Sequence, residues 1–251
     1  MASKEDTIMG NLFVEDHELE EKVEHIDEEI KLPDPKANIV SLPSKGLLGY
    51  PEYIEYREMM VGDEEVLASA TGSTYSKTLN AVLKSVLNDC PFYEKLTLAD
   101  RDWALIWVWA NNYSAIKGVD VTCNNPSCGH THTHKVDLTE LEQIPIKENI
   151  KKNFPKDVAL SKTGGTIRVN YITVADELFV EEFSAKNPDV RVEHALLVRA
   201  LDVGVSIPFD KKLEWVKNNI TSAEMAKIRK LHTHFFYGLK TTIDYTCPAC
   251  K

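Results

Sequence analysis

The chain has 251 residues, of which 43% are hydrophobic, and a formal net charge of −10. That length and apolar content suffice for a buried core in one large or two small domains. The acidic balance argues against nucleic acid as a partner, and the lack of any apolar run of about eighteen residues argues against a transmembrane helix and a membrane partner.

Residues 1–36 form an acidic arm in which twelve acids stand against four lysines, a net charge of −8. Four apolar residues recur there at helical spacing, with glutamates on the opposite side: Leu19, Val23, Ile26 and Ile30. An isolated helix of this length is marginal in water. The arm is therefore either a solvated tail or an amphipathic helix that binds a partner protein through this stripe. We predict the second, with these four residues as the partner-binding site.

Residues 37–118 are predicted to form a mixed part, first strand and then helices. An extended entry over 39–46 and an alternating strand at 53–57 come first. Helical periodicity follows over 64–69 and 76–87.

A tryptophan-rich helix is predicted to close this part. Thr97 and Asp100 resemble a capping box, with Asp in place of the usual Glu or Gln. The helix is apolar on nearly every side, which indicates a central position rather than a carbohydrate platform for its tryptophans Trp103, Trp107 and Trp109. Cys90, alone after an apolar run, is expected to be a core residue.

Residues 119–140 carry the first of two cysteine pairs. Cys123 and Cys128 are separated by four residues and follow a β-like run at 119–122. Such spacing suits a knuckle that aims both sulfurs at one metal ion. A strand is expected to continue from the knuckle over 132–138.

Residues 141–237 are predicted to be an inserted β and helical subdomain. A glycine turn at 163–166 leads into a strand over 167–172. Four helices are expected after it, at about 174–184, 190–201, 211–218 and 221–237. Thr221 and Glu224 form a capping box at the start of the last helix.

Residues 238–251 return to the β unit and bring the second pair, Cys247 and Cys250, after a β-like run at 241–246. Four thiolates close a tetrahedral shell and leave no position for water or substrate, so the two pairs together predict one structural Zn²⁺ site. The predicted fold class is α+β, a mostly helical body with a small β unit closed by a zinc-ribbon-like four-cysteine site.

The cysteines allow three other interpretations. Disulfides require an oxidising compartment, but the polar, acidic first residues do not resemble a signal peptide. A redox Cys-Pro-Ala-Cys loop requires a following helix, whereas only Lys251 follows it. A mixed cysteine–histidine site stays open, with a ligand drawn from His130, His132, His134, His232 or His234, although a solvated polar face explains these residues more simply.

Known catalytic motifs are missing: the sequence has no metalloprotease, nucleophile-elbow, Walker A or dinucleotide fingerprint. The carboxylate pairs Glu64–Glu65 and Glu181–Glu182 are expected on solvated helix faces. We therefore expect neither an enzyme nor a small-molecule substrate.

Several segments resemble one family of phage proteins. They are Leu-Pro-Ser-Lys-Gly at 42–46, Tyr-Pro at 50–51, the alternating strand at 54–60, the acidic helix start at 63–67, and Val-Asp-Leu at 136–138 behind the first knuckle. Together with the C-terminal pair, they are similar to the small baseplate proteins of T-even-type bacteriophages, which are linked to the baseplate hub and its assembly. The resemblance implies a structural or assembly role in a phage tail.

Two functions follow as hypotheses. The first is a non-enzymatic structural or assembly protein of a contractile-tail baseplate, found in the virion or in the host cytoplasm during assembly, whose partners are other tail proteins. The second is a cytoplasmic zinc-containing regulatory or processing factor, with or without an enzymatic activity. Whether the protein stays in the mature particle or leaves as a chaperone is left open.

Overall fold

A computed structural model describes residues 38–71, 75–113, 115–147, 154–234, 237–240, 242 and 245–250. The arm, with Leu19, Val23, Ile26 and Ile30, lies outside the described residues. So do the side chain of His234 and part of the run at 241–246. Residues 35–251 cluster as one unit, and all that follows concerns that unit.

The first part begins with a β-hairpin and continues as helices. Strand β1 (Asn38–Ser41) pairs antiparallel with β2 (Tyr53–Tyr56), as the alternation at 53–57 predicted. The helices that follow are α1 (Val61–Ser69), α2 (Tyr75–Val86), the short 3-10 helix η1 (Tyr93–Lys95) and α3 (Leu98–Asn112). Ile54 and Tyr56 point into the core while their neighbours are exposed, so the alternation reflects one buried face.

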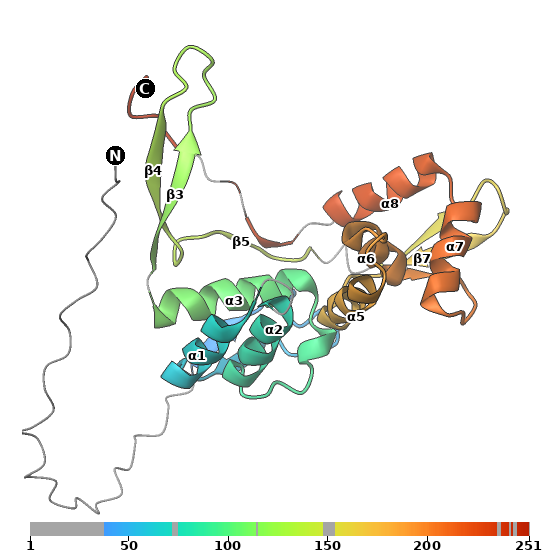
Figure 1. The fold of residues 1–251 in the computed structure, drawn as a ribbon, viewed down its shortest axis with the longest axis horizontal. Coiled ribbons are helices and arrows are strands. Elements are labelled where there is room, and N and C mark those ends of the chain that lie inside the picture. Colours follow the sequence, from blue (N-terminus) through green and yellow to red (C-terminus); the bar gives the residue numbers. More distant parts are fainter. Residues whose placement is uncertain are drawn as a thin grey trace, which may run out of the picture. The chain divides into compact units, whose positions relative to one another are not determined.

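The remainder of the chain adds short strands and a second set of helices (Figure 1). Its strands are β3 (Ile116–Thr122), β4 (Thr131–Asp137), β5 (Gln143–Ile144), β6 (Lys156–Ala159), β7 (Thr166–Val169), β8 (Leu201–Asp202) and β9 (Gly238–Leu239). Its helices are α5 (Val174–Lys186), α6 (Val192–Ala200), α7 (Phe209–Asn219) and α8 (Ser222–His234). The fold is α+β with small antiparallel sheets, as the sequence predicted.

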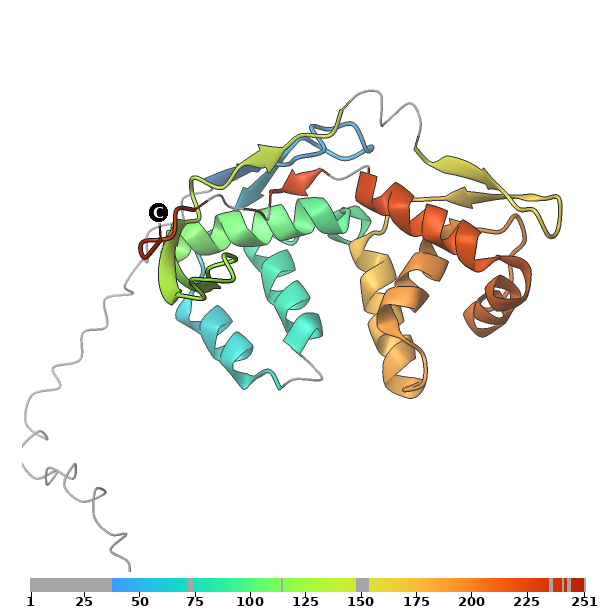
Figure 2. The same ribbon diagram turned by 90° about the horizontal axis from the view of Figure 1, so that it is seen from above.

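Sheet pairing joins segments that are distant in sequence. β3 and β4 form a two-stranded hairpin, β5 pairs with β9, and β6, β7 and β8 form a three-stranded sheet in that order. Figure 2 shows α5 and α6 side by side, which agrees with their extensive packing.

Two hydrophobic clusters make up the core. The first joins the β1–β2 hairpin, α2 and α3, and it includes Cys90 as predicted. The second gathers residues from Ile146 to Tyr237, mainly from β7, α6, α7 and α8. Within the described residues, no helix is both long and apolar enough to cross a bilayer.

A buried polar network links three segments beside these clusters. The carboxylate of Asp100 accepts hydrogen bonds from the Tyr50 hydroxyl and, at 2.9 Å, from the Ser44 amide. The hydroxyls of Thr97 and Tyr237 are hydrogen-bonded to each other. Burial raises the pKa of Asp100. The network fixes the loop after β1, the start of α3 and the segment after α8 against one another.

Two expectations were wrong in detail. The tryptophan helix is not central throughout: Trp103 is buried, but Trp109 is 38% exposed and packs on Tyr113 with ring centroids 4.5 Å apart, because α3 keeps one face in solvent. The strand expected at 241–246 does not form in its described residues, since Thr242, Tyr245 and Thr246 lie outside any strand. β-Propensity needs an adjacent strand edge to act on, and the strand that follows α8 is instead β9, paired with β5.

Candidate metal centre

The first cysteine pair lies in the loop at the tip of the β3–β4 hairpin. β3 ends at Thr122, and the amide of Cys123 donates to the carbonyl of His130 at 2.9 Å, which closes the loop at its base. Inside the loop, the amide of Cys128 donates to the carbonyl of Asn125 at 2.9 Å. The two thiols are thus held on one tight turn, as the spacing predicted.

Asn125 is a further residue of this turn that the sequence reasoning missed. Its side-chain oxygen accepts a hydrogen bond from the Ser127 amide at 3.0 Å, and its side-chain nitrogen lies 3.9 Å from the Cys250 sulfur. An asparagine two residues ahead of the amide it binds is a recognised turn signal and was available in the sequence.

The second pair lies at the C-terminal turn, residues 248–250. Cys247 directly precedes this turn, and Cys250 is its last residue. Backbone N–H groups of Ala249 and Cys250 donate to the Cys247 sulfur and lower its pKa to about 7. Hydrogen bonding to the sulfurs of the other three cysteines raises the pKa of the Cys250 thiol to about 12.

The structure brings the two pairs together. The Cys123 and Cys250 sulfurs are 3.7 Å apart, the Cys128 and Cys247 sulfurs are 3.9 Å apart, and all four sulfurs lie within 4.8 Å of one another. A disulfide would require about 2.05 Å. A tetrahedral Zn²⁺ ion with Zn–S bonds of about 2.3 Å separates its sulfurs by about 3.8 Å, so the four side chains fit such an ion.

His132 and His134 lie on one face of β4, and His130 directly precedes the strand. The rings of His130 and His132 stack with centroids 5.6 Å apart, and those of His132 and His134 meet edge-on at 6.3 Å. The ring of Tyr245 packs against His132 and His134 at centroid distances of 5.6 and 5.8 Å. His132 and His134 are thereby half-buried rather than part of a solvated face. In the described part of the chain, the group of side chains able to hold one metal ion consists of the four cysteines alone.

His232 lies elsewhere. It packs edge-on against Phe154 in the second core cluster, with ring centroids 6.0 Å apart, and burial lowers its pKa. Of the carboxylate pairs, Glu64 and Glu65 are exposed as predicted, and so is Glu182, while Glu181 is half-buried. Glu181 and Glu182 also border a cleft between α2 and α5.

Comparison with known protein families gives a match over most of the chain. The family model described as T4 bacteriophage base plate protein matches residues 34–251, that is, all but the first 33 residues. No curated protein and no solved structure matches the chain.

Proposed function

The chain belongs to the T4 bacteriophage base plate protein family, and from this premise we propose that it is a non-enzymatic structural or assembly protein of the hub region of a contractile tail. On this proposal it works in the virion baseplate, or in the host cytoplasm during assembly, through contacts with other tail proteins. The observation that carries the proposal is the family match over residues 34–251.

The four-cysteine cluster supports a structural rather than a catalytic part for the metal. Four thiolates satisfy tetrahedral Zn²⁺ completely, so no position is left for a substrate or an activated water. Zn²⁺ would supply the positive charge that lets all four thiols ionise at neutral pH.

On this proposal, zinc acts as a staple between distant parts of the chain. Cys123 and Cys250 are 127 residues apart in sequence, and Cys128 and Cys247 are 119 apart. Joining them fixes the C-terminal turn to the tip of the β3–β4 hairpin. The contacts of Tyr245 with His132 and His134 would reinforce the same join.

The arm would supply the partner contact. Its apolar stripe, Leu19, Val23, Ile26 and Ile30, would provide most of the affinity for a neighbouring subunit. The surrounding acids would act mainly on orientation and association rate.

The proposal is tested in a phage from which the gene has been deleted. We expect incomplete tails to accumulate, and the wild-type gene supplied in trans to restore infectious particles. Complete, infectious tails in the deletion phage, or turnover of a small substrate by the purified protein, would refute the proposal.

A further inference from the structure

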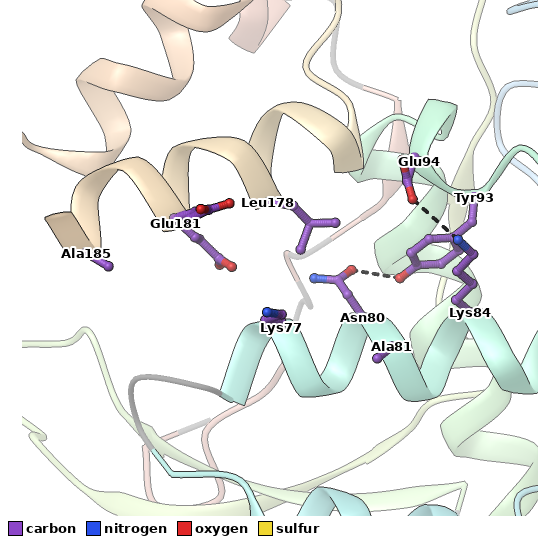
Figure 3. A pocket seen from close by; sticks show the side chains of 10 residues that line it. Lys77, Asn80, Ala81, Lys84, Tyr93, Glu94, Leu178, Glu181 and Ala185 are labelled. Atoms are coloured by element: carbon purple, nitrogen blue, oxygen red, sulfur yellow. Dashed lines mark hydrogen bonds and ion pairs between the residues drawn. The ribbon is translucent and has the colours of Figure 1, made fainter. Parts of the chain in front are cut away.

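A cleft of about 410 Å³ opens between α2, η1 and α5 (Figure 3). Ala81 of α2 and Leu178 of α5 face it from opposite walls, and Tyr93 of η1 closes one end. Ala185, the next-to-last residue of α5, borders it as well. The cleft is separate from the cysteine cluster, with which it shares no residue.

The polar groups at the bottom of the cleft are already paired. The Asn80 side-chain oxygen accepts from the Tyr93 hydroxyl at 2.7 Å and from Arg101 at 2.8 Å, and the Asn80 side-chain nitrogen donates to the Ser76 carbonyl at 3.0 Å. A small polar ligand would therefore find few free partners there, whereas apolar contact remains available.

A buried ion pair holds the walls in place. Arg101 of α3 donates two hydrogen bonds to the Glu177 carboxylate of α5, at 2.7 and 3.0 Å, and also reaches Asn80 of α2. The spacing between α2 and α5 is thus fixed at one end by a bidentate contact. A partner would meet a preformed cleft, which lowers the ordering cost of binding.

The two walls carry opposite charges. Lys77 and Lys84 stand on the α2 side, about two helical turns apart, and Glu181 and Glu182 on the α5 side. Lys84 pairs directly with Glu94 at 3.4 Å, and Glu182 pairs with Lys186 at 2.7 Å. Both pairs are well exposed and open to exchange. Apart from Glu94 of η1 at one end, the cleft therefore presents two lysines on one side of an apolar seam and two glutamates on the other.

We propose that this cleft binds an amphipathic helix of another baseplate protein. The helix would lay small apolar side chains along the seam at Ala81 and Leu178, with acids toward α2 and bases toward α5. A helix suits a groove between two helices, and neither wall offers a strand edge to which an extended peptide could add. The inference rests on the proposed function, which supplies the class of partner.

The test blocks the apolar seam of the cleft with a large side chain. Ala81→Trp is compared with Ala226→Trp, since both alanines are exposed on helices but Ala226 of α8 does not line the cleft. In the deletion phage, we expect Ala81→Trp to lower the yield of infectious particles at least tenfold and Ala226→Trp to leave it unchanged. Both purified variants should melt within a few degrees of the wild type and keep their zinc.

A photo-crosslinking residue at Ala185 then identifies the occupant. We expect a cross-link to a helical segment of another tail protein, mapped by mass spectrometry, that Ala81→Trp abolishes. Cross-links to a second copy of this chain, no cross-link above that from Ala226, or normal assembly of Ala81→Trp would each overturn the inference. If the deletion phage fails while Ala81→Trp assembles normally, only the cleft inference falls; if the deletion phage assembles normally, the proposed function falls with it.

Discussion

The four cysteines differ in their surroundings, although the sequence pattern alone does not distinguish them. Cys247 is buried and receives two backbone N–H groups, which favour its thiolate. Cys250 is exposed and depends on the other sulfurs. A bound metal ion would remove this difference, because its charge favours every thiolate at once.

Replacing Cys250 by serine is the sharpest residue-level test of zinc binding. We expect one equivalent of zinc in the wild type and well under half an equivalent in Cys250→Ser, because three thiolates bind the ion far less tightly than four. The measurement is elemental analysis of purified protein. Cys90→Ser is the control and should keep one equivalent, since Cys90 lies in the first core cluster; a fully loaded Cys250→Ser variant would contradict the assignment.

Glu224 predicts a pH dependence. Its carboxylate accepts from the amides and hydroxyls of Ser161 and Thr221 at 2.6 to 2.9 Å, and these hydrogen bonds lower its pKa from 4.5 to about 2. A depressed carboxyl pKa stabilises the fold above the ordinary value, and that contribution is lost as the pH falls from 4.5 toward 2.

Glu224→Gln should therefore melt below the wild type at pH 7, and the gap should shrink between pH 4.5 and 2. Thermal melts across this range measure it. Glu193→Gln, at a side chain that is 88% exposed, should match the wild type throughout. A gap of constant size down to pH 2 would show that the carboxylate charge is not the cause.

At the scale of elements, a largely buried ion pair joins α5 to α3. Arg101 of α3, whose side chain is 9% exposed, pairs with Glu177 of α5. Helix α5 also carries the exposed pair of Glu182 and Lys186. Removing one partner of a buried pair leaves an uncompensated charge, whereas an exposed pair contributes little.

Glu177→Ala is expected to lower the free energy of unfolding by about 3 kcal/mol. Glu182→Ala on the same helix should cost less than about 1 kcal/mol. Urea titrations of both variants measure the difference. Equal costs would mean that Asp102, which also contacts Arg101 at 2.7 Å, suffices to hold the guanidinium.

The arm has its own prediction. Deleting residues 1–36 should leave the melting temperature and zinc content unchanged, because the family match starts at residue 34 and the cysteines are all elsewhere. Incorporation into tails should be lost. Replacing only Leu19, Val23, Ile26 and Ile30 by serine should have the same effect, and normal assembly of either variant would identify the arm as a solvated tail.

At the scale of the whole molecule, zinc removal should act locally. The cysteines join the β3–β4 hairpin to the C-terminal turn, whereas both hydrophobic clusters consist of other residues. We expect chelation to expose the hairpin amides to rapid hydrogen exchange while amides of α3 stay protected. Mass spectrometry of deuterated peptides measures this, and loss of protection in α3 would show that the metal supports the entire fold.

The sequence by itself determined the features that depend on near neighbours. Helix starts at Thr97, Thr173 and Thr221, the alternation of β2 and the two cysteine turns follow from local hydrogen bonds and side-chain periodicity. The pairing of the two cysteine pairs was also predictable, because four thiolates suit one tetrahedral ion.

Only the tertiary structure decided what depends on packing between distant segments. The strand after α8 is β9, which pairs with β5, and not the run expected at 241–246. Trp109 is partly exposed although α3 is apolar on most sides. The tertiary structure also turned Glu181 and Glu182 into one wall of a cleft opposite Lys77 and Lys84. The physical reason is that strand edges and cleft walls are properties of two elements at once, and no local pattern records which pair will meet.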